Sequence, residues 1–115
     1  MNYVELPANN FDAIKTFFCE VFNWSFIDYG RDDIAFADQG LDGGFYRSKL
    51  ISSSTTIGAL IVFYSQSLEQ TLQKIDQAGG IINKSIFELP SGRRFHFCEP
   101  HCNEYAVWSD LKTMV

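Results

Sequence analysis

The chain has 115 residues, of which 46% are hydrophobic, 16% aromatic and 20% charged, and its formal net charge is −5. This length suits one ordinary domain with its own core, and the aromatic content excludes a disordered or fibrous chain. The acidic balance, with a sequence pI of about 4.8, repels phosphate backbones, so we expect no nucleic-acid partner.

The sequence predicts no secretion signal in its first residues and no membrane-spanning segment. The first residues lack a basic region followed by a long apolar run, and the longest apolar stretch, residues 59–64, is too short to cross a bilayer. Three cysteines, Cys19, Cys98 and Cys102, cannot all pair within one chain. We therefore expect a cytoplasmic protein with reduced thiols, no disulfide framework and no membrane partner.

The first half of the chain predicts a strand, a helix and three short strands. Residues 3–6 alternate as a half-buried strand does, and Asn9-Asn10 offers a helix cap. Apolar residues recur at helical spacing from Phe11 to Phe22, where Asn23-Trp24 closes the run. Turn residues then separate strands expected at 25–29, 34–38 and 44–47.

The second half repeats this order. Residues 59–64 predict a strand, Ser67 caps a helix that ends at Gly79-Gly80, and strands are expected at 80–86, 94–98 and 105–109. The helices start at residues 11 and 68, an offset of 57, about half of the chain. Such a period predicts a duplicated unit in one domain, residues 1–115, with module one at about 1–50 and module two at about 57–112. We expect an α+β fold in which two βαβββ modules pair into a curved, partly open mixed β-barrel with the helices outside.

Four segments in this order resemble the vicinal oxygen chelate superfamily, which includes glyoxalases, extradiol dioxygenases and bleomycin-resistance proteins. They are Val4-Glu-Leu-Pro-Ala-Asn-Asn10, Phe17-Phe-Cys-Glu-Val-Phe-Asn-Trp24 (the family's FYxxVFGW), Ala78-Gly-Gly80, and Glu99-Pro-His-Cys-Asn103 in place of the family's DPxGN turn. The resemblance covers nearly the whole chain. It implies the fold and a homodimer, but no particular reaction.

Metal enzymes of this family hold a divalent ion with a His or Glu on the first strand of each half and a Glu on the last. The resemblance places the first-strand positions on Tyr3 and Leu60 and the last-strand positions on Ala106 and on Phe45, or Tyr46 if one loop is a residue longer. Leu60, Ala106 and Phe45 offer no lone pair, and neutral Tyr is a rare ligand. We therefore expect no metal and no other cofactor.

A ligand is expected on the concave inner face, because the helices cover the outer one. The ligand-binding candidates on that face are Tyr3, Glu5, Phe45, Tyr46, Leu60, Val62, Arg94, His96, Ala106 and Trp108. Trp24 is a further aromatic candidate for the ligand wall, although ordinary core packing is the simpler account of it.

Glu5 shares a strand face with Tyr3, so it is the candidate catalytic residue, as a general base or as the partner of a cationic group. A water-exposed rim carboxylate is the simpler account, and as a replacement metal ligand Glu5 has only His96 as a possible partner. Arg94 and His96 alternate with the core candidates Phe95 and Phe97, so they could bind a carboxylate or phosphate. Exposure at the sheet edge explains Arg94 and His96 equally well.

The segment from His96 to Cys102 contains four possible zinc ligands, His96, Cys98, His101 and Cys102. The first pair lies on a strand and the second in a tight turn, so convergence on one ion would break the hairpin. A turn with a buried thiol is the interpretation we adopt, and Cys19 is expected to be a small buried residue of the first helix.

The leading hypothesis is a metal-free small-molecule-binding homodimer with an aromatic-rich cavity. The alternative is an enzyme of the same superfamily, lyase-, isomerase- or dioxygenase-like. It would be either metal-independent, with Glu5 moving a proton and Arg94 or His96 stabilising negative charge, or dependent on a non-standard metal site.

Overall fold

A computed structural model describes residues 2–37, 39–56 and 58–110. Module one contains β1 (Tyr3–Ala8), α1 (Phe11–Phe22), β2 (Ile27–Asp28), β3 (Asp33–Phe36) and β4 (Asp42–Arg47). A short 3-10 helix, η1 (Ser54–Thr56), follows, and module two contains β5 (Ile61–Tyr64), α2 (Leu68–Gln77), β6 (Ile81–Leu89), β7 (Gly92–Cys98) and β8 (Glu104–Asp110). The βαβββ order predicted for each half is confirmed.

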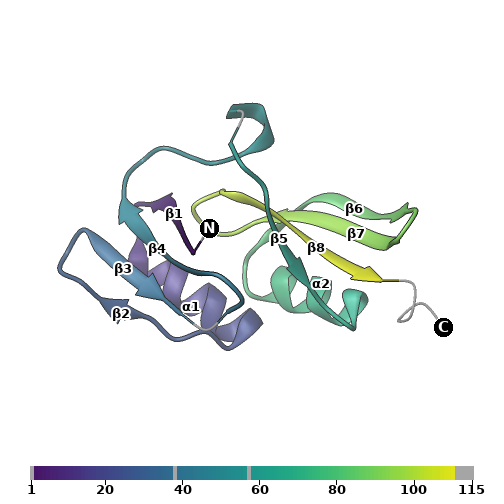
Figure 1. Ribbon diagram of the computed structural model, residues 1–115, viewed down its shortest axis with the longest axis horizontal. Helices are drawn as coiled ribbons and strands as arrows, with labels where there is room; N and C mark the ends of the chain where they lie inside the picture. The colour runs from purple at the N-terminus through teal and green to yellow at the C-terminus, as the bar shows by residue number, and fades with distance from the viewer. Residues whose placement is uncertain (1, 38, 57, 111–115) are drawn as a thin grey trace.

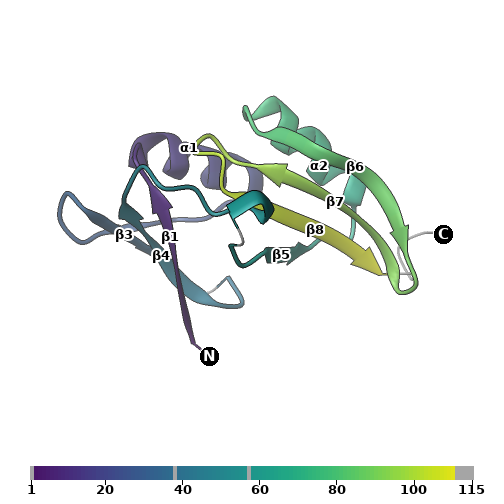
Figure 2. The same cartoon turned by 90° about the horizontal axis from the view of Figure 1, so that it is seen from above.

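The described residues form two four-stranded mixed sheets, with strand orders β1-β4-β3-β2 and β5-β8-β7-β6 (Figure 1). In each sheet the first strand pairs in parallel with the last strand of its module, and the other pairings are antiparallel. The sheets do not close on one another. The fold is α+β, a pair of curved open sheets, and both helices lie on the same side of them (Figure 2).

Helix α1 begins and ends where its sequence predicts. The Asn10 side chain accepts a hydrogen bond from the Ala13 amide (3.1 Å), and Asn23 ends the helix in the left-handed conformation, with φ 58°. Cys19 is exposed, so the expectation of a buried thiol is wrong. The buried stripe runs through Phe18 and Val21, and successive helical residues are about 100° apart, which turns Cys19 away from the core. Within the described residues, neither helix is long and apolar enough to cross a membrane.

Aromatic rings join the two modules into one continuous core. Phe22 of α1 stacks on Phe63 of β5 with ring centroids 4.6 Å apart, and the ring of Phe18 meets Tyr105 of β8 edge-on at 5.7 Å. Phe95 and Phe97, which the sequence places beneath the second helix, are fully buried in the same cluster. The concave faces, which carry Tyr3 and His96, are the faces turned away from the helices.

The turn between β7 and β8 fastens module two to module one. Asn103 is fully buried; its Nδ2 donates to the Pro7 carbonyl (2.7 Å), and its Oδ1 accepts from the Ser52 amide (2.9 Å). His101 accepts from the Asn9 amide at Nδ1 (3.3 Å), so its proton lies on Nε2, which donates to the Leu50 carbonyl (2.6 Å). These bonds set the position of β1 relative to β8.

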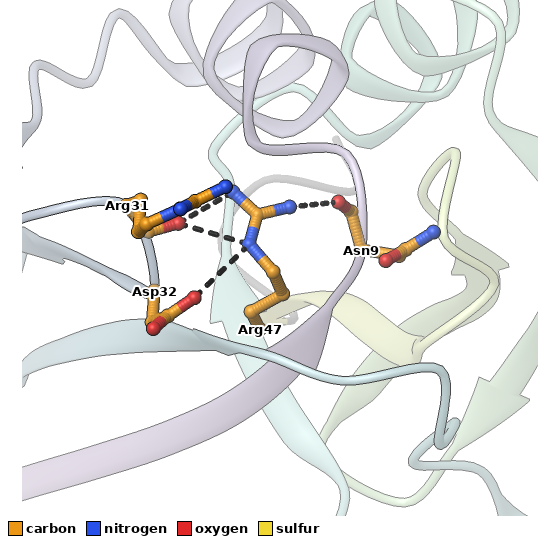
Figure 3. A network of polar contacts seen from close by, with 4 residues as sticks. All are labelled: Asn9, Arg31, Asp32 and Arg47. Atoms are coloured by element: carbon orange, nitrogen blue, oxygen red, sulfur yellow. Dashed lines mark hydrogen bonds and ion pairs between the residues drawn. The ribbon is translucent and has the colours of Figure 1, made fainter.

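Arg47, the last residue of β4, joins three segments of module one (Figure 3). Its Nη1 donates to the Asn9 carbonyl (2.6 Å), while Nε and Nη2 donate to the Arg31 carbonyl (2.9 and 2.6 Å). The guanidinium also lies 4.5 Å from the centre of the Phe11 ring and 3.5 Å from an Asp32 carboxylate oxygen. Arg47 therefore ties the start of α1 to the β2–β3 turn.

Candidate functional site

A cavity of about 400 Å³ lies at the junction of the two modules, between β1 and β5. We call it the junction cavity. Val4 and Leu6 line it from β1, and Ile61 and Phe63 line it from β5. The volume lies within the range of roughly 300–1,000 Å³ that small-molecule sites occupy.

Aromatic rings form much of the wall of the junction cavity. Trp24 stacks between Phe18 and Phe36, with centroid distances of 4.7 and 4.4 Å. Tyr105 also lines the cavity, and its hydroxyl donates to Glu99 (2.7 Å). Gln39 supplies a polar side chain at the wall. This arrangement suits an apolar, aromatic molecule that needs one hydrogen bond.

Three of the ten predicted ligand-binding residues line the junction cavity: Phe45, Leu60 and Val62. Phe45 reaches it from the helix side of its sheet, since its ring packs 5.8 Å from Phe18 and only 2% of the residue is exposed. Its placement on the concave face is therefore wrong by one residue of register, and Tyr46, the alternative, is the residue turned to that face.

Tyr3 and Glu5 line a separate small pocket on the concave face of module one, together with Tyr29 and Asp33. Val4 packs against the core and Leu6 is buried, as the predicted strand alternation requires, while Glu5 is exposed. Burial, and then the neighbouring Glu5 carboxylate, raise the pKa of Tyr3, so its hydroxyl stays protonated. The structure does not bring His96 or Arg94 into this pocket.

The concave face of module two carries a carboxylate–imidazole pair that the sequence did not predict. His96 Nδ1 lies 3.0 Å from Glu104 Oε2, and both side chains are about nine-tenths buried. A polar groove of about 390 Å³ passes both residues and is lined by Ser53 and Lys84 among others. Arg94 lies 5.6 Å from the Phe87 ring centre and Ala106 is fully buried, whereas Trp108 packs against Tyr64 at 5.2 Å.

Sequence and structure comparisons agree on the family and the fold of this chain. Residues 1–105 match the family model of the glyoxalase/bleomycin resistance protein/dioxygenase superfamily. The chain belongs to this superfamily. No curated protein sequence matches it significantly.

Solved structures of this superfamily share the fold at low sequence identity. A glyoxalase-related enzyme from Fulvimarina pelagi superposes with a TM-score of 0.78 at 13% identity, over 96% of this chain and 87% of that one. The fosfomycin resistance protein FosX from Listeria monocytogenes gives 0.78 at 16% identity, over 100% and 97% of the two chains. Lactoylglutathione lyase from Agrobacterium tumefaciens gives 0.70 at 14% identity, over 95% and 92%.

The metal that many superfamily enzymes hold does not fit the residues present here. In module one, the first-strand position holds Tyr3, whose neutral phenol is a rare ligand, and the last-strand candidate Phe45 is buried against Phe18. In module two, the matching positions hold the aliphatic residues Leu60 and Ala106. Across the described part of the chain, no three His, Cys, Asp or Glu residues gather as a metal-binding group.

The four soft ligands between His96 and Cys102 separate in the structure. His96 pairs with Glu104, His101 binds backbone groups of module one, and Cys98 is buried whereas Cys102 is exposed in the turn. The zinc interpretation therefore has no support from the geometry.

Sequence reasoning missed several residues of the junction cavity, among them Phe36, Gln39 and Leu41. Phe36 lies two residues after Ile34 on β3, so both side chains point to the helix-facing side. Leu41 is a large apolar residue in a glycine-rich turn. A large apolar side chain in such a turn was the signal that could have indicated the cavity.

Proposed function

We propose that this chain is a metal-free small-molecule-binding protein of the glyoxalase/bleomycin resistance type, with its ligand in the junction cavity. The observation that carries the proposal is an apolar, ring-lined cavity of about 400 Å³. The aliphatic residues Leu60 and Ala106 at positions where metal enzymes need donors support it further. Burial of a planar apolar ligand against Trp24 would supply most of the binding free energy.

The proposal is tested with N-phenyl-1-naphthylamine, a neutral aromatic dye that fluoresces in apolar surroundings. We expect saturable binding and a thermal stabilisation that grows with dye concentration. Leu60→Trp fills the cavity and should weaken binding about tenfold or more.

Two variants serve as controls for Leu60→Trp. Ile81→Trp adds the same ring at an exposed position of β6 outside the cavity, and Glu5→Gln alters the concave face of module one. Both should bind the dye as the wild type does. Unsaturable binding, or equal binding by Leu60→Trp, would contradict the proposal.

The enzyme alternative has less support from the geometry. Glu5 lies outside the junction cavity, and the pocket that contains it has a volume of only about 30 Å³. A general base must reach its substrate proton within hydrogen-bonding distance, and this pocket has no room for a substrate in the conformation described.

A second copy of this chain is the partner we propose for the concave faces. Exposed apolar side chains, including Val62 and Tyr64, lie on the face of module two that also carries Lys84 and Arg94. The concave face of module one carries the acidic residues Glu5 and Asp33. Exposed apolar surface of this kind favours pairing between copies, and Lys84 and Arg94 are cationic partners for Glu5 and Asp33 of the other copy. Light scattering should give the mass of a dimer; a monomer at micromolar concentration would contradict this.

Location in the cytoplasm stays a prediction.

A further inference from the structure

The wall of the junction cavity carries no charge. The described residues that line it include no Asp, Glu, Lys, Arg or His. Asp42, which follows the cavity-lining turn along the chain, lines a separate pocket beside Tyr3 and Tyr29. An ion that entered the junction cavity would lose its water without gaining a counter-charge, which is costly. Such a wall disfavours anions and cations alike.

Gln39 supplies a free side-chain amide at this wall. Within the part of the chain that the structure describes, this amide makes no hydrogen bond and no ion pair. The hydroxyl of Tyr105, which also lines the cavity, already donates its proton to Glu99 (2.7 Å). Gln39 can therefore present both a carbonyl acceptor and an NH₂ donor to a ligand.

The loop between β3 and β4 brings Gln39 to the cavity. Gly40 has a φ of 92°, in the left-handed region that favours glycine, and the residues on both sides of it, Gln39 and Leu41, line the wall. Leu41 is half-buried whereas Gln39 is exposed, so Gln39 lies on the solvent side of the wall. Water satisfies its amide before a ligand binds, and a ligand that bonds to it must offer equally good partners.

We propose that the junction cavity selects uncharged planar aromatic molecules that carry a carboxamide-like group, and that Gln39 determines this specificity. The inference rests on the proposed function, because it concerns the same cavity. The ligand's ring packs against Trp24 and Phe36, and its polar group exchanges a donor and an acceptor with the Gln39 amide. Amides, lactams and cyclic imides have this pair, whereas a carboxylate lacks the donor and an ammonium group lacks the acceptor.

The selection against charge is tested by displacing N-phenyl-1-naphthylamine from the full chain with three naphthalenes of similar size. At neutral pH, 1-naphthamide is uncharged, 1-naphthoate is an anion and 1-naphthylmethylammonium is a cation. We expect 1-naphthamide to displace the dye, and each ion to need a concentration about a hundredfold higher, because neither finds a counter-charge in the cavity.

Variants of Gln39 separate recognition of the amide from hydrophobic binding. Gln39→Leu should weaken 1-naphthamide about fivefold and leave 1-methylnaphthalene, which has no polar group, unaffected. Gln39→Lys should strengthen 1-naphthoate about tenfold, since it adds the missing counter-charge. Gln70→Leu and Gln70→Lys make the same changes at an exposed position of α2 outside the cavity, and should leave every affinity at its wild-type value.

Two results would overturn this inference while leaving the proposed function intact. One is displacement of the dye from the wild type by 1-naphthoate as readily as by 1-naphthamide. The other is an equal loss of affinity for 1-naphthamide and 1-methylnaphthalene in Gln39→Leu, because a residue that only shapes the wall would affect both. Absence of any dye binding is a different outcome, which would overturn the proposed function and this inference together.

Discussion

Glu99 is a carboxylate with only 1% of its surface exposed, and it accepts three hydrogen bonds. The Asn103 amide donates to Oε1 (3.1 Å), while Asn103 Nδ2 and the Tyr105 hydroxyl donate to Oε2 (2.9 and 2.7 Å). In either orientation, Glu99→Gln puts its amide nitrogen, itself a donor, against at least one of these donors, so we expect the free energy of unfolding to fall by about 2–3 kcal/mol. Tyr105→Phe removes one donor and should cost about 1–2 kcal/mol. Urea unfolding measures both, and a larger loss in Tyr105→Phe would contradict this account.

The same carboxylate gives the stability a pH dependence of definite sign. Burial raises the pKa of Glu99, although hydrogen bonds from Tyr105 and Asn103 oppose the shift. The folded protein then binds this proton more tightly than the unfolded chain, so its contribution to stability falls as pH rises from the ordinary carboxyl pKa through the raised folded value. The stability difference between wild type and Glu99→Gln should therefore shrink across that window and be constant above it. Urea midpoints at stepped pH check this, and a difference that grows would contradict it.

At this scale the sequence identified residues better than it identified their partners. Glu99 and Asn103 were recognisable in a turn motif, but the contact of Asn103 with Pro7 joins residues 96 positions apart. His96 was placed on the concave face, yet its partner Glu104 was not considered. Such pairings depend on strand register, which short alternating segments specify only weakly.

Arg47 links three elements of module one, and its contribution can be isolated (Figure 3). Arg47→Lys keeps the charge but loses the planar fork that reaches the Asn9 and Arg31 carbonyls together. We expect a loss of about 1 kcal/mol in the free energy of unfolding, discounted because the side chain is 41% exposed. Arg31→Ala is the matched control, because Arg31 takes part through its backbone carbonyl. A similar loss in both variants, measured by urea unfolding, would show that the fork is not responsible.

The helices and the Asn10 cap of α1 followed from the sequence, whereas the Ser67 side chain makes no capping hydrogen bond to α2 and the edges of the sheets were not predicted. Apolar spacing sets the limits of α1, and its predicted span, Phe11–Phe22, is the observed one. The strand expected at 25–29 is reduced to Ile27–Asp28. As an edge strand it can form ladder hydrogen bonds only to β3, and only these two residues are paired with that strand. The junction cavity escaped prediction because it requires the relative position of β1 and β5, which long-range contacts of the β7–β8 turn set.

The two modules share one aromatic core, and this has a consequence for the cooperativity of the whole molecule. Trp24 lies in the core of module one, and Trp108 lies on β8 of module two, so each tryptophan reports on one module. Rings such as Phe22 and Phe63 pack across the boundary, so exposing one module would expose apolar surface of the other. We expect Trp24→Phe and Trp108→Phe each to unfold in urea with coincident fluorescence and circular dichroism transitions. Trp24→Phe should have the lower midpoint of the two, because Trp24 is the more deeply buried ring. If instead the two probes separate within either variant, the modules unfold independently, and the hydrogen bonds from Asn103 to Pro7 and Ser52, rather than the shared core, are what join them.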